Sequence, residues 1–284
     1  MALPQTTESD GISAARLLTR PAVPHPDRQG KTGDPPNRRL VNVTLPVHNG
    51  AAYLERAVVS VWQFLHSRYP FEIVIAENGS TDQTRTVARA LAAKFDAVRL
   101  METDRPGRGR ALTAAWLSSK ADVLSYMDVD LATELACFPK LIGALEDADI
   151  AVGSRLDSGA VVQRGLKREL ISRAYNLLVR TLFTTPVRDM QCGFKAMNAE
   201  VARRLLPMIK DPGFFWDTEL LLKASALGLK IASVPVNWRD SPTSSVNIIK
   251  TAWADLCGLR RVRKEIRYIP GLLTAAGQSQ QPSA

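Results

Sequence analysis

Cysteine and histidine are scarce in this chain. Its 284 residues include only three histidines and three cysteines, Cys137, Cys192 and Cys257. Three widely spaced cysteines exclude a disulfide framework, and nothing in the sequence pairs Cys or His at the spacing of a zinc site. These absences favour a reducing cytosol.

Long apolar runs are missing as well. No stretch approaches the roughly 20 apolar residues that cross a bilayer, and the first residues lack the apolar segment of a signal peptide. We therefore expect a cytoplasmic protein that does not span a membrane. Peripheral contact with the inner face of the cell membrane stays open.

The N-terminal stretch has little apolar periodicity. It carries scattered charges and several prolines, including Pro21, Pro24, Pro26, Pro35 and Pro36, a composition typical of disorder. We expect a disordered leader at 1–38, a main domain at 39–245, and a basic helix with a tail at 246–284.

Positive charge, in contrast, is in excess. The 37 basic and 28 acidic residues give a net charge of +9, which suits an anionic partner such as nucleic acid, a phospholipid surface or a phosphate-bearing substrate. Aromatic residues do not interleave with the basic ones, which argues against nucleic acid.

The final helix is especially basic, with Arg260, Arg261, Arg263, Lys264 and Arg267. Together with an apolar face over 166–182 it suits an anionic membrane, and a helix packed on the domain with a solvated basic side is the alternative.

From Leu40 onward, short β-rich runs alternate with helical segments. The runs are "LVNVTLP", "FEIVIAE", "AVRLME", "DVLSYMD" and "DIAVGS", and the helical segments between them cover 51–65, 82–95, 109–120 and 135–146. Such alternation predicts an α/β fold with a doubly wound, mostly parallel sheet. After Arg155 we expect helices at 166–182, 217–227 and 248–268, and a strand in "KIASVPVNW".

Polar motifs follow four of the expected strands. They are "PVHNG", "ENGSTD", "MDVDLAT" and "GSR". In open α/β sheets ligands bind beyond the carboxyl ends of the strands, so we expect these motifs to meet at one crevice.

Asp128 and Asp130 are the best candidates for a metal site. They follow the β-rich "VLSY", and side chains two residues apart lie on the same face of a strand. Both carboxylates then reach one hard cation, Mg²⁺ or Mn²⁺, which also accepts phosphate oxygens. The alternative is a pair of solvated loop aspartates, and the position at a strand end favours the metal.

Glu77 and Asn78 end a second expected strand. An acid here suits hydrogen bonds from a nucleobase, whereas Gly79 in a turn and Ser80 with Gln83 as a capping box would make the motif a helix cap alone.

In "RPGRGRAL", Gly107 and Gly109 open a helix among arginines, which suits a phosphate or nucleotide. The motif lacks the third glycine of a dinucleotide fingerprint and the lysine of a P-loop, so both are rejected, and a basic surface loop is the alternative.

Arginines cluster after the "GSR" strand. Arg155 ends the strand, and Arg164, Lys167, Arg168 and Arg173 follow it. The planar fork of arginine matches phosphate, so an anionic acceptor fits here, and exposed helix charges are the alternative.

His48 has no partners for a triad and is expected to be a hydrogen-bonding loop residue. In "GFFWDTE" only Asp217 and Glu219 are candidates for chemistry.

Taken in order, these strings resemble the family 2 glycosyltransferases of the GT-A fold, from Leu40 to about Tyr268. Within the family the chain is most similar to polyprenyl-phosphate hexose synthases, the dolichyl-phosphate β-glucosyltransferases first and the mannose synthases next. The strings that carry the resemblance are "LPVHNG", "ENGSTDQT", "GRGRAL", "MDVDLAT", "VGSR", "VRDMQCGFKAM", "FFWDTELLLKA" and "VPVNW".

The resemblance implies a role for each motif. The nucleotide-binding residues are Pro46, His48, Glu77, Asn78, Gly109 and Asp128, and the metal ligands are Asp128 and Asp130. The acceptor-phosphate residues are Arg155, Arg168, Ser172 and Arg239, and the catalytic set is Asp128, Asp130, Arg155 and Asp217.

The chain departs from the family pattern in four places, two of which involve a pair of residues. His48 and Gly50 stand where an aromatic residue and an acid are usual, and Glu77-Asn78 replaces two aspartates. Ser245 stands where Lys or Arg usually follows a serine, and Arg239 is the candidate substitute for that charge. Ala132 replaces the glutamine of the mannose branch, and "DLAT" is closer to the glucose branch, which favours UDP-glucose over GDP-mannose.

The implied reaction is a single inverting displacement by a polyprenyl phosphate. A phosphate monoester has a second pKa of about 6, so the nucleophile is already ionised and needs no strong base. A hydroxyl acceptor, such as a saccharide, would instead need Asp217 or Glu219 as base. The third alternative is a non-catalytic relative that only binds nucleotide sugars.

Overall fold

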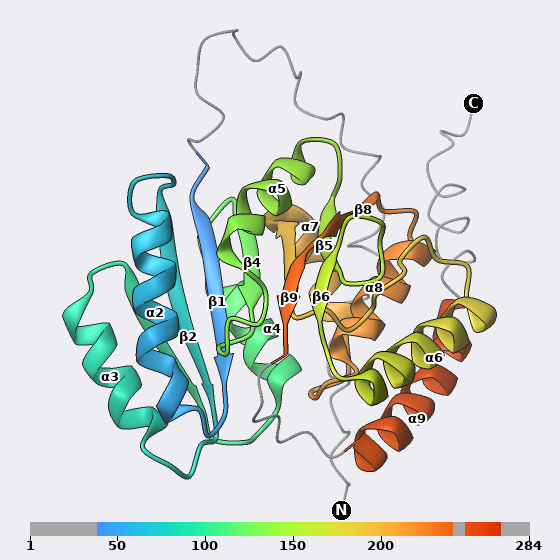
Figure 1. The fold of residues 1–284 in the computed structure, drawn as a ribbon, viewed down its shortest axis with the longest axis horizontal. Coiled ribbons are helices and arrows are strands. Elements are labelled where there is room, and N and C mark those ends of the chain that lie inside the picture. The colour runs from blue at the N-terminus through green and yellow to red at the C-terminus, as the bar shows by residue number, and fades with distance from the viewer. Residues whose placement is uncertain (1–38, 241–247, 268–284) are drawn as a thin grey trace, which may run out of the picture.

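A mostly parallel sheet forms the centre of the molecule (Figure 1). The computed structural model describes residues 39–240 and 248–267. Within them, seven strands pair in the order β3-β2-β1-β4-β7-β5-β8. Their bounds are β1 Val41–Val47, β2 Phe71–Asn78, β3 Val98–Thr103, β4 Val123–Met127, β5 Ile150–Ser154, β7 Phe194–Asn198 and β8 Ile231–Pro235. Only β7 runs antiparallel to its neighbours, so the expected α/β sheet is confirmed.

Helices connect the strands. They are α2 Ala51–Leu65, α3 Thr84–Lys94, α4 Arg108–Ser118, α5 Phe138–Gly143, α6 Leu166–Leu182, α7 Ala199–Leu205, α8 Trp216–Ala226 and α9 Ile248–Ile266. The short 3₁₀ turns η1 Leu135–Cys137 and η2 Ala144–Glu146 flank α5, and η3 Leu206–Met208 follows α7. The continuous helix expected over 135–146 is therefore broken, with a proline in the first turn of α5. A second sheet pairs β6 Val161–Gln163 with β9 Asn237–Arg239.

Helices cover both faces of the central sheet, which is why its strands are so apolar. All seven residues of β1 are buried, as expected for a strand with no solvent face. In β4, Met127 packs into the cluster that contains the buried face of α2, whereas Leu124 and Tyr126 pack into a cluster with α4 and α8. Alternate residues of one strand thus supply two cores.

Strand β7 was not expected from the sequence. It follows the loop "RDMQCG" and inserts between β4 and β5, antiparallel to both. The turn before β7 consequently reaches the end of β4, where the backbone N–H of Asp128 donates to the carbonyl oxygen of Gly193 (3.2 Å).

The C-terminal helix α9 shares a core with the main domain. Leu259 and Val262 are buried in the same cluster as α8. The guanidinium of Arg261 donates to both carboxylate oxygens of Glu219, each at 2.8 Å. The expected leader, the tail and Ser245 lie outside the described residues. In the part that is described, no helix is both long and apolar enough to cross a membrane.

Candidate active site

The carboxylate of Asp128 lies directly beyond the end of β4. Its side chain is 36% exposed, and Gly193 passes so close that a Cβ on that glycine would lie 1.7 Å from the Asp128 Oδ2 atom. Real Cβ atoms do not approach an oxygen this closely, so position 193 accepts only glycine while Asp128 keeps this place. The glycine of "QCGFK" is therefore part of the site.

Asp130 lies two residues further on, in a tight turn. Leu131 adopts a left-handed conformation (φ 52°), and the Ala132 N–H donates to the Asp130 Oδ1 atom (3.1 Å). Burial raises the pKa of Asp130, and the negative charge of Asp128 raises it further. The two carboxylates are thus near enough to repel each other, as expected of ligands that share a cation.

The two aspartates fit a divalent metal ion as part of its coordination shell. Carboxylate oxygens are the ligands that Mg²⁺ and Mn²⁺ prefer. Across residues 39–240 and 248–267, no cluster of three His, Cys, Asp or Glu side chains is arranged to hold a metal. Two carboxylates leave further coordination positions of such an ion open, and diphosphate oxygens or water are ligands that suit these positions.

Arg108 joins Asp128 to Asp217. One guanidinium nitrogen donates to the Asp128 Oδ1 atom (2.8 Å), and the other donates to the Asp217 Oδ2 atom (2.5 Å). The guanidinium also stacks over the ring of Tyr126, 4.8 Å from its centroid. The first residue of α4 thereby ties the end of β4 to α8.

Asp217 is buried in a network of positive partners. Lys195 Nζ lies 2.9 Å from its Oδ1 atom, and the Tyr126 hydroxyl donates to the same oxygen. Burial alone would raise the pKa of Asp217, but the charges of Lys195 and Arg108 outweigh it and lower the pKa. Both carboxylate oxygens are therefore occupied, and the group is a weak base.

Glu219 is likewise fully paired. Besides Arg261, its Oε1 atom accepts from Lys223 Nζ (2.6 Å), and its carboxylate accepts the backbone N–H groups of Lys210 and Asp211. Burial opposes ionisation, yet these partners lower the pKa of Glu219 to about 2. Glu219 therefore anchors α9 and is not available as a base.

The expected nucleotide side is organised by Asn78. Its side-chain amide donates to the Val47 carbonyl (3.2 Å) and accepts the Gly107 N–H (3.1 Å). The Asn78 carbonyl oxygen lies 2.9 Å from His48 Nδ1, and His48 is exposed at the edge of the sheet. Asn78 thus joins β1, β2 and the glycine-arginine loop, whereas Pro46 is buried within β1.

Glu77 is directed into the protein. Its carboxylate accepts the Ser80 N–H (2.5 Å) and Arg85 Nε (2.9 Å). Although burial opposes it, these two hydrogen bonds lower the pKa of Glu77. The expected capping box is wrong, because Gln83 forms no side-chain cap and Asp82 Oδ1 accepts the Thr84 N–H instead (3.0 Å).

Gly109 has a packing reason to be glycine. A Cβ at this position would lie 2.5 Å from the Cβ of Trp216, which is fully buried. The close approach of α4 and α8 therefore explains this glycine without a nucleotide.

Arg155 is paired inside the protein. Its Nε and one terminal nitrogen donate to the two oxygens of Asp189, each at 2.8 Å, and its guanidinium stacks over Trp238 (4.7 Å). Burial would lower the pKa of Arg155, but Asp189 outweighs it and raises the pKa. The planar fork expected to bind an acceptor thus already holds a carboxylate.

The other expected acceptor residues lie on α6 and β9. Arg168 donates to Asp240 (3.3 Å), and Ser172 follows one helical turn later on the same face. The side chain of Arg239 is exposed, while its backbone N–H donates to the carbonyl of Ala132 (2.8 Å). Strand β9 is thereby joined to the loop that carries Asp130.

Lys195 and Asp189 were not predicted from the sequence, and Arg108 was expected only as part of a motif that suits a phosphate or nucleotide, with a basic surface loop as the alternative. Lys195 and Asp189 are both 0% exposed. Both lie in "VRDMQCGFKAM", so the motif signalled the segment, but nothing local signals that its charges are buried.

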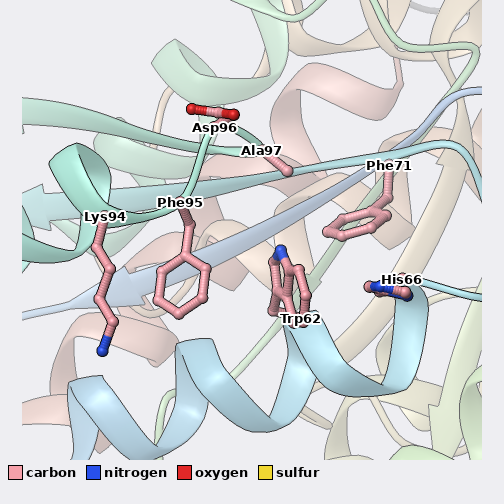
Figure 2. A pocket seen from close by; sticks show the side chains of 7 residues that line it. All are labelled: Trp62, His66, Phe71, Lys94, Phe95, Asp96 and Ala97. Carbon is pink, nitrogen blue, oxygen red and sulfur yellow. The ribbon is translucent and has the colours of Figure 1, made fainter.

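A hollow of about 360 Å³ lies at the opposite end of the strands. Figure 2 shows its aromatic walls at the start of β2 and the end of α2. The lining residues are Trp62, His66, Phe71, Lys94, Phe95, Asp96 and Ala97. It shares no residue with the acidic site.

Two groups of known proteins are similar to this chain in sequence. AglD of Haloferax volcanii is 35% identical over 249 residues, which cover 82% of this chain and 40% of AglD. The mouse dolichyl-phosphate beta-glucosyltransferase is 31% identical over 256 residues, which cover 84% of this chain and 78% of the mouse protein. The chain thus spans less than half of AglD and about four fifths of the mouse enzyme.

The fold is also known. Glucosyl-3-phosphoglycerate synthase from Mycobacterium tuberculosis, solved in complex with UDP, superposes with a TM-score of 0.59 at 22% identity and 80% coverage of both chains. This likeness establishes the GT-A fold. Residues 43–206 match the family model for glycosyl transferase family 2, and the chain belongs to that family of enzymes.

Proposed function

We propose that the protein transfers a hexose, with inversion, from a nucleotide-diphospho-sugar to a polyprenyl phosphate. UDP-glucose is the favoured donor and GDP-mannose the next. The names of the relatives support a dolichyl-type acceptor, and glucosyl-3-phosphoglycerate synthase has been solved with Mn²⁺ and UDP-glucose.

One observation carries the choice of a phosphate acceptor. The two acids that a hydroxyl acceptor would need as base, Asp217 and Glu219, have all their oxygens occupied and lowered pKa values. A phosphate monoester, with a second pKa of about 6, attacks without a base. The site therefore suits a nucleophile that arrives already ionised.

The acidic residues serve the leaving group. Asp128 and Asp130 are the proposed ligands of Mg²⁺ or Mn²⁺. When bound, the ion neutralises the charge that develops on the leaving diphosphate. Gly193 leaves room for the carboxylate of Asp128, and the turn at Leu131 orients that of Asp130.

The nucleotide is assigned to the edge around β1 and β2. His48 is exposed there, and the buried Asn78 joins this edge to the glycine-arginine loop by accepting the Gly107 N–H. Three buried residues support this edge from within. Pro46 is buried in β1, and Glu77 accepts hydrogen bonds from Ser80 and Arg85. Gly109 lets α4 pack closely on Trp216.

A lipid-facing surface is part of the proposal. In α6 the side chains of Leu166, Leu170 and Leu177 are 89%, 70% and 56% exposed, and in α9 those of Trp253 and Leu256 are 71% and 48% exposed. The same helix α9 exposes the basic residues Arg260, Arg263 and Lys264, and the exposed Arg267 directly follows it. In Figure 1 both helices lie on the side of the molecule away from α2 and α3. Exposed leucine and tryptophan beside basic residues suit an anionic lipid surface.

The membrane part is tested by sedimentation with liposomes. We expect binding to vesicles that contain phosphatidylglycerol at low salt, weaker binding at high salt, and loss of binding when Leu170 and Trp253 are changed to Ser. Equal binding of the variant, or no binding by the unchanged protein, contradicts the lipid surface.

The reaction is tested with a panel of UDP- and GDP-sugars, a short polyprenyl phosphate, and Mg²⁺ or Mn²⁺. A glycolipid product formed from UDP-glucose is the expected result. Transfer to soluble saccharides alone would establish a hydroxyl acceptor. Nucleotide-sugar binding without transfer or hydrolysis would establish a non-catalytic relative.

A further inference from the structure

Arg164 is a largely buried arginine whose guanidinium lacks hydrogen bonds. Its side chain is 12% exposed, and its Nε and Nη1 atoms are buried with no hydrogen-bond partner among the described residues. The nearest carboxylate oxygens, from Asp240 and Glu169, each lie 3.7 Å away. Hydrogen bonds of this kind need about 2.7 to 3.2 Å, and a buried charged donor without them is costly. The fold therefore holds a guanidinium ready for another acceptor.

The carboxylate of Asp240 is shared too widely to satisfy Arg164. This carboxylate accepts from Trp238 Nε1 (2.8 Å) and from Arg168 (3.3 Å). The backbone N–H of Asp240 donates to the Gln163 carbonyl. The Oε1 atom of Glu169 accepts from Arg173 (2.6 Å), whereas its Oε2 atom, 3.7 Å from Arg164, is buried without a hydrogen-bond partner among the described residues. The neighbouring Arg155 has its own full partner in Asp189. Positive charge is therefore in excess around Arg164.

A second unmatched group lies on α6. Ser172 is 5% exposed, and its hydroxyl has no hydrogen-bond partner among the described residues. It follows Arg168 by one turn, on the same helical face. Arg164, directly after β6, and Ser172, in α6, thus both carry buried polar atoms that form no hydrogen bond with the described residues.

This cluster adjoins the acidic loop. Trp238 forms a β-bridge with Thr133, and the Arg239 N–H donates to Ala132. An anion bound at Arg164 would consequently lie beside the loop proposed to hold the metal and the donor diphosphate.

We propose that Arg164 binds the phosphate of the acceptor and that Asp240 is an internal anion which this phosphate replaces. The proposal rests on the proposed polyprenyl-phosphate acceptor. A phosphate monoester offers three oxygens and more charge than a carboxylate, so it can accept from Arg164, Arg168 and Ser172 where Asp240 cannot. Asp189, unlike Asp240, is not replaced by the phosphate, because it is 0% exposed and accepts hydrogen bonds from Arg155 with both carboxylate oxygens.

The test compares Arg164→Gln and Arg164→Lys with Asp240→Asn, and uses Arg180→Gln, an exposed arginine later in α6, as the matched control. Calorimetry measures the binding of a short, water-soluble isoprenyl phosphate and of inorganic phosphate to the full chain without donor. Steady-state assays then give separate KM values for the acceptor and for UDP-glucose. Thermal melting shows that each variant is folded.

We expect Arg164→Gln to weaken isoprenyl-phosphate binding about tenfold or more, with the KM of UDP-glucose unchanged, and Arg164→Lys to weaken it less because charge is kept but the fork is lost. Asp240→Asn should tighten binding, and Arg180→Gln should leave it unchanged. Inorganic phosphate binding with the same dependence on Arg164 also supports the proposal.

Unchanged phosphate binding in Arg164→Gln overturns the proposal. So does a loss of binding in Asp240→Asn similar to that in Arg164→Gln, because the cluster would then be structural. If the unchanged protein transfers sugar to no polyprenyl phosphate, the proposed function fails, whereas phosphate binding that depends on Arg164 is measured independently of transfer.

Discussion

Arg108 holds one oxygen of Asp128 at 2.8 Å while its other terminal nitrogen pairs with Asp217. One arginine thus neutralises a carboxylate beyond β4 and another on α8. Since Asp128 is a proposed metal ligand, Arg108 and the metal compete for the same carboxylate. The Arg108 guanidinium thus occupies one oxygen of Asp128 when no metal is bound.

Removal of Arg108 should therefore strengthen metal binding. A hydrogen bond to a charged group contributes about 1.5 to 3 kcal/mol, so Arg108→Met should raise the affinity of the free protein for Mn²⁺ about tenfold or more. Electron paramagnetic resonance of free Mn²⁺ measures this without any substrate. Arg105→Met, an equal change of charge at an exposed position in the same loop, is the control. Equal affinities in the two variants would contradict the competition.

Gly193 should be essential for the metal site but not for the fold. In Gly193→Ala the new Cβ would meet Asp128 Oδ2 at 1.7 Å, so the carboxylate must move. We expect Mn²⁺ affinity and sugar transfer to fall by about tenfold or more. Gly143→Ala adds a Cβ with nothing within 4 Å and should change neither. Full metal affinity in Gly193→Ala would show that Asp128 does not hold the ion.

The Asp217 and Lys195 pair should be strongly coupled in stability. Removing one partner of a buried ion pair leaves the other charge without its counterion, which costs about 3 to 5 kcal/mol. Asp217→Asn and Lys195→Met should each destabilise the protein by roughly this amount, and the double variant by clearly less than the sum. Urea denaturation measures the free energy of unfolding, with Asp96→Asn at the exposed surface as the control. Additive effects would mean that the two groups do not interact.

Asp255 should make stability depend on pH. Burial raises its pKa from 3.8 to about 7, although Gln191 donates to it at 3.0 Å. Between about pH 4 and pH 7 the Asp255 carboxyl therefore keeps its proton in the folded state and loses it in the unfolded state. The free energy of unfolding is highest below about pH 4 and falls as the pH rises to about 7.

Asparagine at position 255 stays neutral and retains an acceptor for Gln191. Asp255→Asn should thus match the wild type in stability near pH 4 and exceed it at pH 8 by up to about 4 kcal/mol. Thermal unfolding of both proteins across this range measures the difference. A difference that does not change with pH would show that Asp255 is ionised in the folded state throughout.

The sequence by itself determined the elements and the order of the motifs. Periodicity is local, so the helices Ala51–Leu65 and Leu166–Leu182 were predicted at their observed bounds. The alternation of strands and helices determined the parallel part of the sheet, because such connections leave few topologies. It also brought "PVHNG", "ENGSTD" and "MDVDLAT" to one edge, because parallel strands end together.

Only the tertiary structure decided which charges face one another. Asp189 and Arg155 are 34 residues apart, and Arg108 and Asp217 are 109 apart, so no local pattern pairs them. Strand β7 was missed for the same reason, since its place between β4 and β5 depends on distant partners. A carboxylate acts as base, ligand or anchor according to what surrounds it, and burial and long-range pairing set those surroundings.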